Sequence, residues 1–151
     1  MFEIESKGPE DIVITTKTRE IRFDLAAQTI DADIPAGKIE GPGEFEIGEA
    51  AIRGISTESG RTIYDVVINN VHVGIIGAID EATALDELGM ANVLCTSSVR
   101  AVREIDPKLV IAMGNIDGMV MELKVPARTE KKVKIKSLET LPATLEVVAL
   151  A

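Results

Sequence analysis

The chain has 151 residues, a net charge of −9, one cysteine and no tryptophan. This length is enough for one domain with a substantial hydrophobic core, and we expect a single domain over residues 1–151. Because 46% of the residues are hydrophobic and 27% are charged, the composition excludes a disordered chain. The acidic balance disfavours nucleic-acid binding. A single cysteine excludes an internal disulfide and a multi-cysteine zinc site.

The sequence predicts neither a signal peptide nor a membrane-spanning segment. Residues 1–5 lack the basic and apolar regions of a signal peptide. The most apolar run, from Val66 to Ile79, is interrupted by Asn69 and Asn70 and is shorter than the roughly 20 apolar residues that cross a bilayer. We therefore expect a cytoplasmic protein without membrane association.

The first half of the chain has the alternating pattern of β-strands. Asn69 and Asn70 separate two of these strands, and asparagine tolerates the positive φ angles of a type I′ turn, so we expect a hairpin there. The predicted strands of this half cover residues 11–16, 20–25, 28–34, 44–47, 50–55, 62–68 and 71–76.

The second half alternates between helix and strand. Asp80 is a candidate cap for a helix that ends at Gly89, and Ser97 or Ser98 is a candidate cap for a second helix that ends at Asp106-Pro107. A strand, a helix and a strand joined by short loops form a parallel crossover unit. The predicted strands of this half cover residues 92–96, 108–113, 120–125, 131–135 and 145–150. The pattern thus predicts a β-rich α/β protein with two helices.

A basic segment runs from Glu122 to Lys136, with six basic and two acidic residues. Within it, lysines alternate with Val133 and Ile135. This alternation is typical of an edge strand whose outward lysines prevent pairing with another sheet edge. An anion-binding module that uses Lys124 to Lys136 is the alternative, and its binding would weaken with salt.

The segment Gly41-Pro42-Gly43 predicts a type II turn, because proline suits its first central position and glycine its second. Phe45 and Ile47 follow, in alternation with Glu44, Glu46 and Gly48, as in a half-buried strand.

Together with four later segments, this turn and strand resemble the small prokaryotic proteins of the metallo-β-lactamase fold, in the branch similar to ascorbate-6-phosphate lactonases. The resemblance runs from about Gly41 to the C-terminus. It implies a β-rich α/β sandwich of two mixed sheets, shortened and with few helices. The segments that carry it are 41–48, 60–64, 70–79, 85–93 and 106–113.

The resemblance also says where metal ligands would stand. Hydrolases of this family bind one or two metal ions through a His-x-His-x-Asp-His loop, two further histidines and an aspartate, and the metal activates water. This chain lacks that loop, and the other ligand positions align with Ile75, Ala78, Gly114 and either Glu58 or Ser59. One histidine cannot rebuild such a site, so we expect no catalytic, cofactor-binding or metal-binding residue of the family type and no cofactor.

Other reactive groups have ordinary structural interpretations. We expect His72 to lie on the surface and Cys95 to be a buried small hydrophobe. A nucleophile and base pair formed by Cys95 and His72 is an alternative, without an evident third group to orient it. The adjacent pairs Asp80-Glu81 and Asp86-Glu87 are interpreted as solvated helix charges.

The function that we expect is therefore that of a metal-free, degenerate metallo-β-lactamase-fold protein that acts without catalysis. If the first sheet has lost its cover, an apolar outer face would favour association, so we expect a homodimer or a protein partner bound through the N-terminal half. A hydrolase with a carboxylate metal site, for instance at Glu44, Glu46 and Glu58, is the alternative from another class; such ligands suit Mg²⁺, Ca²⁺ or Mn²⁺.

Overall fold

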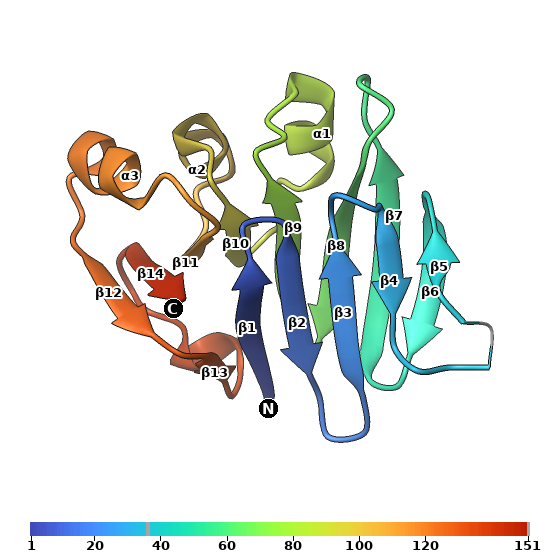
Figure 1. Ribbon diagram of the computed structural model, residues 1–151. Coiled ribbons are helices and arrows are strands. Elements are labelled where there is room, and N and C mark those ends of the chain that lie inside the picture. Colours follow the sequence, from blue (N-terminus) through green and yellow to red (C-terminus); the bar gives the residue numbers. More distant parts are fainter. Residues whose placement is uncertain (36, 151) are drawn as a thin grey trace.

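Two β-sheets pack face to face in the computed structural model, which describes residues 1–35 and 37–150 (Figure 1). The six-stranded sheet has the order β13-β1-β2-β3-β4-β5, and all its pairs are antiparallel. Its strands are β1 (Phe2–Gly8), β2 (Asp11–Thr15), β3 (Glu20–Asp24), β4 (Thr29–Asp31), β5 (Ile39–Glu40) and β13 (Val133–Ile135).

The eight-stranded sheet is mixed, with the order β12-β14-β11-β10-β9-β8-β7-β6. Strands β6 to β9 pair in antiparallel fashion, whereas β9, β10, β11, β14 and β12 run parallel. Its strands are β6 (Gly43–Ile47), β7 (Ala50–Ser56), β8 (Thr62–Ile68), β9 (Val71–Gly77), β10 (Val93–Thr96), β11 (Leu109–Ala112), β12 (Ala127–Glu130) and β14 (Glu146–Leu150).

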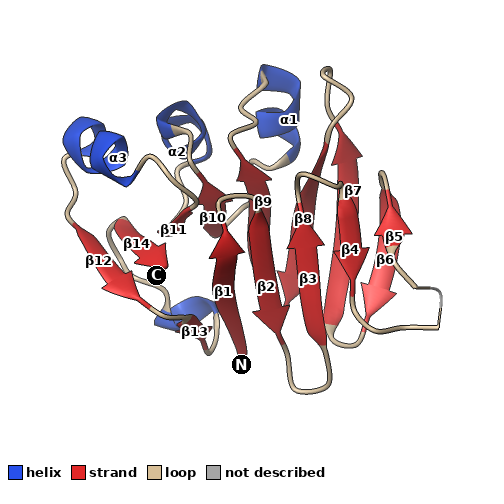
Figure 2. Cartoon of the chain, in the orientation of Figure 1, coloured by secondary structure: helices blue, strands red, loops and turns tan. Residues whose placement is uncertain are grey.

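Three α-helices within the described residues gather on one side of the molecule, and none covers the front of β1 to β4 (Figure 2). They are α1 (Ala82–Glu87), α2 (Val99–Ile105) and α3 (Ile116–Leu123), and a short 3₁₀ helix, η1, covers Leu138–Thr140. The helices pack on the outer face of the eight-stranded sheet, where Leu85 and Met119 join Ile76 and Val110 in one buried cluster. The six-stranded sheet therefore has one face in the core and one in solvent.

The main core lies between the two sheets and consists mostly of aliphatic side chains from alternate strand positions. Phe23 and Tyr64 form its aromatic centre, with ring centroids 5.2 Å apart and an interplanar angle of 57°. This β-rich α/β sandwich confirms the predicted fold class.

Several local predictions are also confirmed. Asn69 and Asn70 have φ angles of 52° and 65°, as a type I′ hairpin requires. The Ser98 hydroxyl accepts a hydrogen bond from the Ala101 amide at 3.1 Å and so caps α2, which crosses between the parallel strands β10 and β11. The alternating lysine segment forms β13, an edge strand with Val133 and Ile135 buried.

Other predictions were wrong. Residues 120–125 belong largely to α3, because Ile116, Met119, Val120 and Leu123 recur at helical spacing and continue a pattern that begins before Val120. The third helix was therefore missed. Strands β1 and β12 were also not predicted, and the predicted strand at 28–34 is shorter, at Thr29–Asp31. Asp80 does not cap α1, whose N-cap is Glu81.

The predicted type II turn at Gly41-Pro42-Gly43 was wrong. Gly43 already belongs to β6, and its φ of 148° is far from the value of about 80° that such a turn needs. A Cβ on Gly54 would lie 3.2 Å from both the Gly41 oxygen and the Pro42 Cα. The segment thus packs its backbone directly on Gly54 of the neighbouring strand.

Candidate functional site

The candidate site is the edge of the sandwich at which β7, β9, β10 and β11 end, at the top of Figure 1. Ligands of sheets with parallel strands usually bind beyond the carboxyl ends of the strands. We call this region the upper edge. It comprises residues 57–61, 78–81, 97–98 and 113–115 of the eight-stranded sheet, and the turns at 8–11 and 25–28 of the other sheet.

Asp80 at the upper edge is held by the start of α2. Its carboxylate accepts a hydrogen bond from the Ser98 hydroxyl at 3.0 Å. The Ser98 amide in turn donates to the Thr96 hydroxyl at 2.9 Å, and this fully buried hydroxyl donates to the Gly77 carbonyl at 2.7 Å. Asp80 therefore belongs to a network that ties β9 to β10.

Glu81 and Glu58 tie the loop between β7 and β8 to α1. The Glu81 carboxylate accepts hydrogen bonds from the Ser59 amide at 2.9 Å and from its hydroxyl at 2.7 Å. The Ser59 hydroxyl, followed by weaker backbone and hydroxyl donors nearby, lowers the pKa of Glu81. Glu58 accepts a hydrogen bond from the Thr83 hydroxyl at 3.3 Å. These carboxylates thus bind local donors instead of converging on one point.

Arg61 joins the two sheets at this edge. Its guanidinium donates to the Leu25 carbonyl at 3.0 Å and lies 3.7 Å from a Glu10 carboxylate oxygen. The Gln28 side-chain oxygen accepts a hydrogen bond from the Thr62 amide at 3.0 Å. Both contacts connect the six-stranded sheet to the start of β8.

The positions that align with the family's metal ligands have other surroundings here. Ile75 is fully buried between the sheets, whereas Ala78 is exposed. Gly114 borders a hollow of about 370 Å³, whose other lining residues are Ser6, Gly8, Pro9, Ala112, Ile116 and Leu150. Such a lining offers no imidazole or carboxylate, so the residues present do not fit a zinc ion.

No group of three or more His, Cys, Asp or Glu side chains suited to a metal ion occurs among residues 1–35 and 37–150. Glu44 and Glu46 are exposed on the outer face of β6, whereas Glu58 lies in the loop beyond β7, hydrogen-bonded to Thr83. The structure therefore does not bring together the three carboxylates of the alternative metal site.

A second hollow, of about 450 Å³, lies over β6, β7 and β8, and its Arg53 reaches Glu87 of α1. We call it the outer hollow; it is lined by Glu44, Phe45, Glu46, Ala51, Ile52, Arg53, Asp65 and Val67. The Arg53 guanidinium lies 3.7 Å from Asp65 and 3.2 Å from Glu87, and it donates to the Glu87 carbonyl at 2.9 Å. Sequence reasoning missed this cluster, because β7, β8 and α1 bring it together from distant positions.

His72 and Cys95 lie on opposite faces of the eight-stranded sheet. Cys95 is fully buried in the core between the sheets, and burial raises the pKa of its thiol. His72 is partly buried on the outer face, with Nδ1 3.4 Å from an Asp65 carboxylate oxygen. The alternative Cys–His pair is therefore wrong, since a strand directs neighbouring register positions to different faces.

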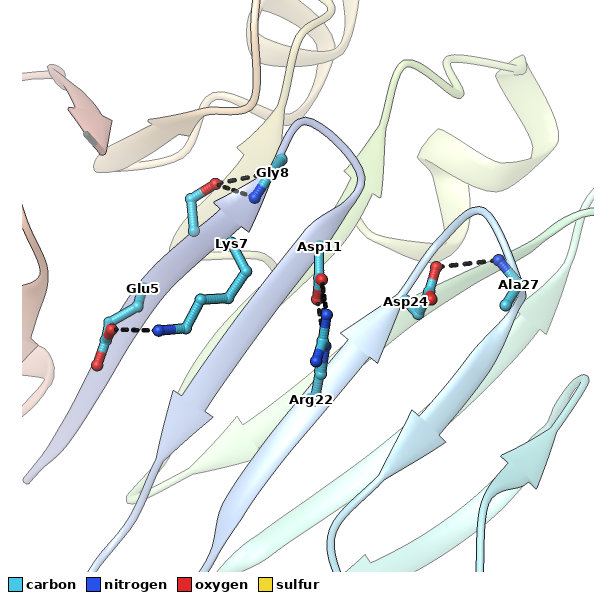
Figure 3. A network of polar contacts seen from close by, with 8 residues as sticks. Glu5, Lys7, Gly8, Asp11, Arg22, Asp24 and Ala27 are labelled. Atoms are coloured by element: carbon cyan, nitrogen blue, oxygen red, sulfur yellow. Dashed lines mark hydrogen bonds and ion pairs between the residues drawn. The ribbon is translucent and has the colours of Figure 1, made fainter.

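The outer face of the six-stranded sheet is polar, contrary to the apolar face expected from the sequence. Asp11 and Arg22 form a two-pronged ion pair on it, Lys7 contacts Glu5, and Asp24 accepts a hydrogen bond from the Ala27 amide (Figure 3). Val13 lies among these groups, opposite Glu5 and Arg22, and only 3% of it is exposed. The described residues around β1, β2 and β3 thus present charged groups on this face, with their one apolar side chain, Val13, covered.

No protein-family model matches the chain, and a search of curated proteins found no match either. Among solved structures, the chain is similar to a proposed zinc-dependent hydrolase of the metallo-β-lactamase superfamily from Thermotoga maritima. The TM-score is 0.72 over the full length of both chains, at 14% sequence identity. The protein thus has a metallo-β-lactamase-like fold. No helix within the described residues is long and apolar enough to span a membrane.

Proposed function

We propose that this chain is a non-catalytic, metal-free protein of the lactonase-like branch of the metallo-β-lactamase fold, and that it acts by self-association. The chemistry of the upper edge carries the metal-free part of the proposal, and the opposite charges of the edge strands β6 and β13 support self-association. Its carboxylates Asp80, Glu81 and Glu58 accept hydrogen bonds from hydroxyl and amide groups of the same edge. Each carboxylate is oriented by its own donors, and no third ligand converges with them in the described part of the chain, so no ligand set for a metal ion is assembled at this edge.

The surroundings of Gly114 support the same view. Glycine offers no ligand where the resemblance places a histidine, and the hollow beside it is bordered by Pro9, Ile116 and Leu150. Zinc in a hydrolase needs three protein ligands and an open position for water. A protein that keeps the sandwich but lacks these ligands would act by binding through its surface instead of by metal-dependent hydrolysis.

Equilibrium dialysis tests the metal-free part of the proposal. The protein is dialysed separately against Zn²⁺, Mn²⁺ and Mg²⁺, and the bound metal is measured by inductively coupled plasma mass spectrometry. We expect much less than one metal ion bound per chain. The double variant Asp80→Asn with Glu81→Gln should bind the same small amount. Stoichiometric metal in the original chain, lost in that variant, would overturn the proposal and identify the upper edge as a metal site.

Light scattering coupled to size-exclusion chromatography tests the association. We expect an average mass that rises above the 16.2 kDa of one chain as the concentration increases. A constant mass of one chain at every concentration would contradict self-association and direct the search to a different partner.

A further inference from the structure

Each sheet ends in an edge strand of strongly biased charge. Strand β6 is an edge of the eight-stranded sheet, and β13 is an edge of the six-stranded sheet. Edge strands present unpaired backbone groups that can pair with another chain unless their side chains prevent it. The other two edge strands are β5 and β12. The charges on β6 and β13 therefore decide whether these two edges can pair with each other or each with its own kind.

The edge at β6 is acidic. Glu44 and Glu46 are both exposed and point outward, and no ion pair engages either of them in the described part of the chain. Arg53, which lies opposite Glu44 in the register, directs its guanidinium to Asp65 and Glu87. Beside the glutamates, the outer hollow offers Ala51 and Val67 as an apolar floor for the stem of a long side chain.

The edge at β13 is basic. Lys132, Lys134 and Lys136 are exposed, and Lys131 precedes them. Among the described residues, these lysines form ion pairs only with Glu3 of the neighbouring strand β1, at 3.1 Å from Lys132 and 3.9 Å from Lys134. One carboxylate shared by two lysines leaves an excess of positive charge at this edge. The lysines therefore oppose pairing of β13 with a neutral or basic edge, but not with an acidic one.

These charges favour one kind of pairing and oppose the other two. Two β6 edges would place glutamates beside glutamates, and two β13 edges would place lysines beside lysines. Like charges opposite each other destabilise strand pairs, whereas opposite charges stabilise them and select the partner. We propose that copies of this chain join head to tail, with β13 of one copy adding to β6 of the next.

The two edges lie toward opposite ends of the sandwich, with β13 at the lower left, to the right of β12, and β6 at the right of Figure 1. One chain therefore cannot join its own edges, and each copy offers one edge to each of two neighbours. Such a heterologous contact produces an open chain of copies or a closed ring, not a two-fold dimer. The inference rests on the proposed self-association and adds the surfaces and the symmetry.

Charge reversal and mixing test this arrangement. The first variant, Glu44→Lys with Glu46→Lys, has two basic edges, and the second, Lys132→Glu with Lys134→Glu, has two acidic edges. The matched control, Glu20→Lys with Asp86→Lys, changes the net charge as the first variant does, at exposed positions of β3 and α1. Masses are measured by sedimentation velocity, and far-UV circular dichroism with thermal unfolding checks that each variant is folded.

We expect assemblies of the original chain and of the control, single chains for each charge-reversed variant alone, and restored assemblies when the two variants are mixed. Raising the salt from about 10 mM to about 1 M, which shortens the Debye length from roughly 30 Å to roughly 3 Å, should dissociate the assemblies of the original chain. The salt series needs no variant, so a misfolded variant does not prevent the test.

Assemblies that persist in both variants and in high salt would overturn the head-to-tail proposal but leave self-association standing. Single chains of the original protein at every concentration and at low salt would overturn both. Metal binding by the upper edge would overturn only the metal-free part of the proposed function. Recovery of assemblies by mixing would be difficult to explain by any pairing of like edges.

Discussion

Gly54 lies directly beneath the backbone of Pro42, so that an added Cβ would come within 3.2 Å of the Pro42 Cα and of the Gly41 oxygen. The Gly-Pro-Gly segment therefore owes its position to close packing against a second glycine, on the strand next to it. This contact fixes the start of β6, and with it the acidic edge proposed to bind another copy.

Replacement of Gly54 by alanine should destabilise the protein. The added methyl group meets backbone atoms that cannot rotate away, and overpacking of this kind costs about 1–3 kcal/mol. The matched control is Gly89→Ala, whose Cβ would make only an ordinary contact of 3.5 Å with the Asp86 carbonyl. Urea unfolding curves give the free energy of unfolding of each variant. Equal free energies of unfolding for the two variants would contradict the packing described for Gly54.

Removal of the Tyr64 hydroxyl should leave the stability unchanged or raise it. The hydroxyl is buried without a hydrogen-bond partner in the described structure, and burial raises the pKa of Tyr64 to about 12. A buried hydroxyl that lacks a partner costs free energy, whereas the ring packs on Phe23. We expect Tyr64→Phe to be neutral or stabilising in urea unfolding, and Tyr64→Ala to lose roughly 3–5 kcal/mol. A loss of more than about 1 kcal/mol in Tyr64→Phe would mean that an ordered water or another group binds the hydroxyl.

The contact between Glu81 and Ser59 should make the stability depend on pH in the acid range. The pKa of Glu81 is lower in the folded protein than its ordinary value of 4.5, so the contact stabilises the fold above that value. The stabilisation is lost as the pH falls through the lowered pKa. We expect Glu81→Gln to melt at a slightly lower temperature than the original chain at neutral pH. This difference in melting temperature should become smaller in acid, where Glu81 of the original chain is protonated. A constant difference in melting temperature across this range would contradict the assignment.

The Cys95 thiol should be unreactive in the folded protein. It is fully buried, and its burial raises the pKa and so suppresses the reactive thiolate. Dithionitrobenzoate should label the native chain very slowly at neutral pH and the urea-unfolded chain at once. Rapid labelling of the native chain would show that the core opens locally around β10.

Much of the fold could be predicted where the signal is local. Asn69 and Asn70 predict their hairpin through the φ angles that they accept, and the alternation around Lys132 and Lys134 predicts an edge strand. Helix α3 was missed because its apolar spacing begins at Ile116, ahead of the segment interpreted as a strand. Residue patterns thus predict an element when its periodic spacing is recognised over its whole length.

The polar contacts could not be predicted in the same way. Arg53, Asp65 and Glu87 come from three elements, and only the register of β7 with β8 and the position of α1 bring them together. Asp80 looked like a helix cap, yet its carboxylate binds Ser98, which is distant in sequence. No spacing along the chain encodes such contacts, because they depend on how the sheets and helices pack.

Native mass spectrometry separates a metal-free assembly from a metal-bound or single chain, because it reports bound metal and the number of subunits together. The protein is purified without chelator and measured before and after exposure to Zn²⁺, Mn²⁺ and Mg²⁺. We expect masses that are whole multiples of the metal-free chain, with more than one copy at low ionic strength. A stoichiometric metal retained by every chain, or a single chain under all conditions, would contradict this expectation.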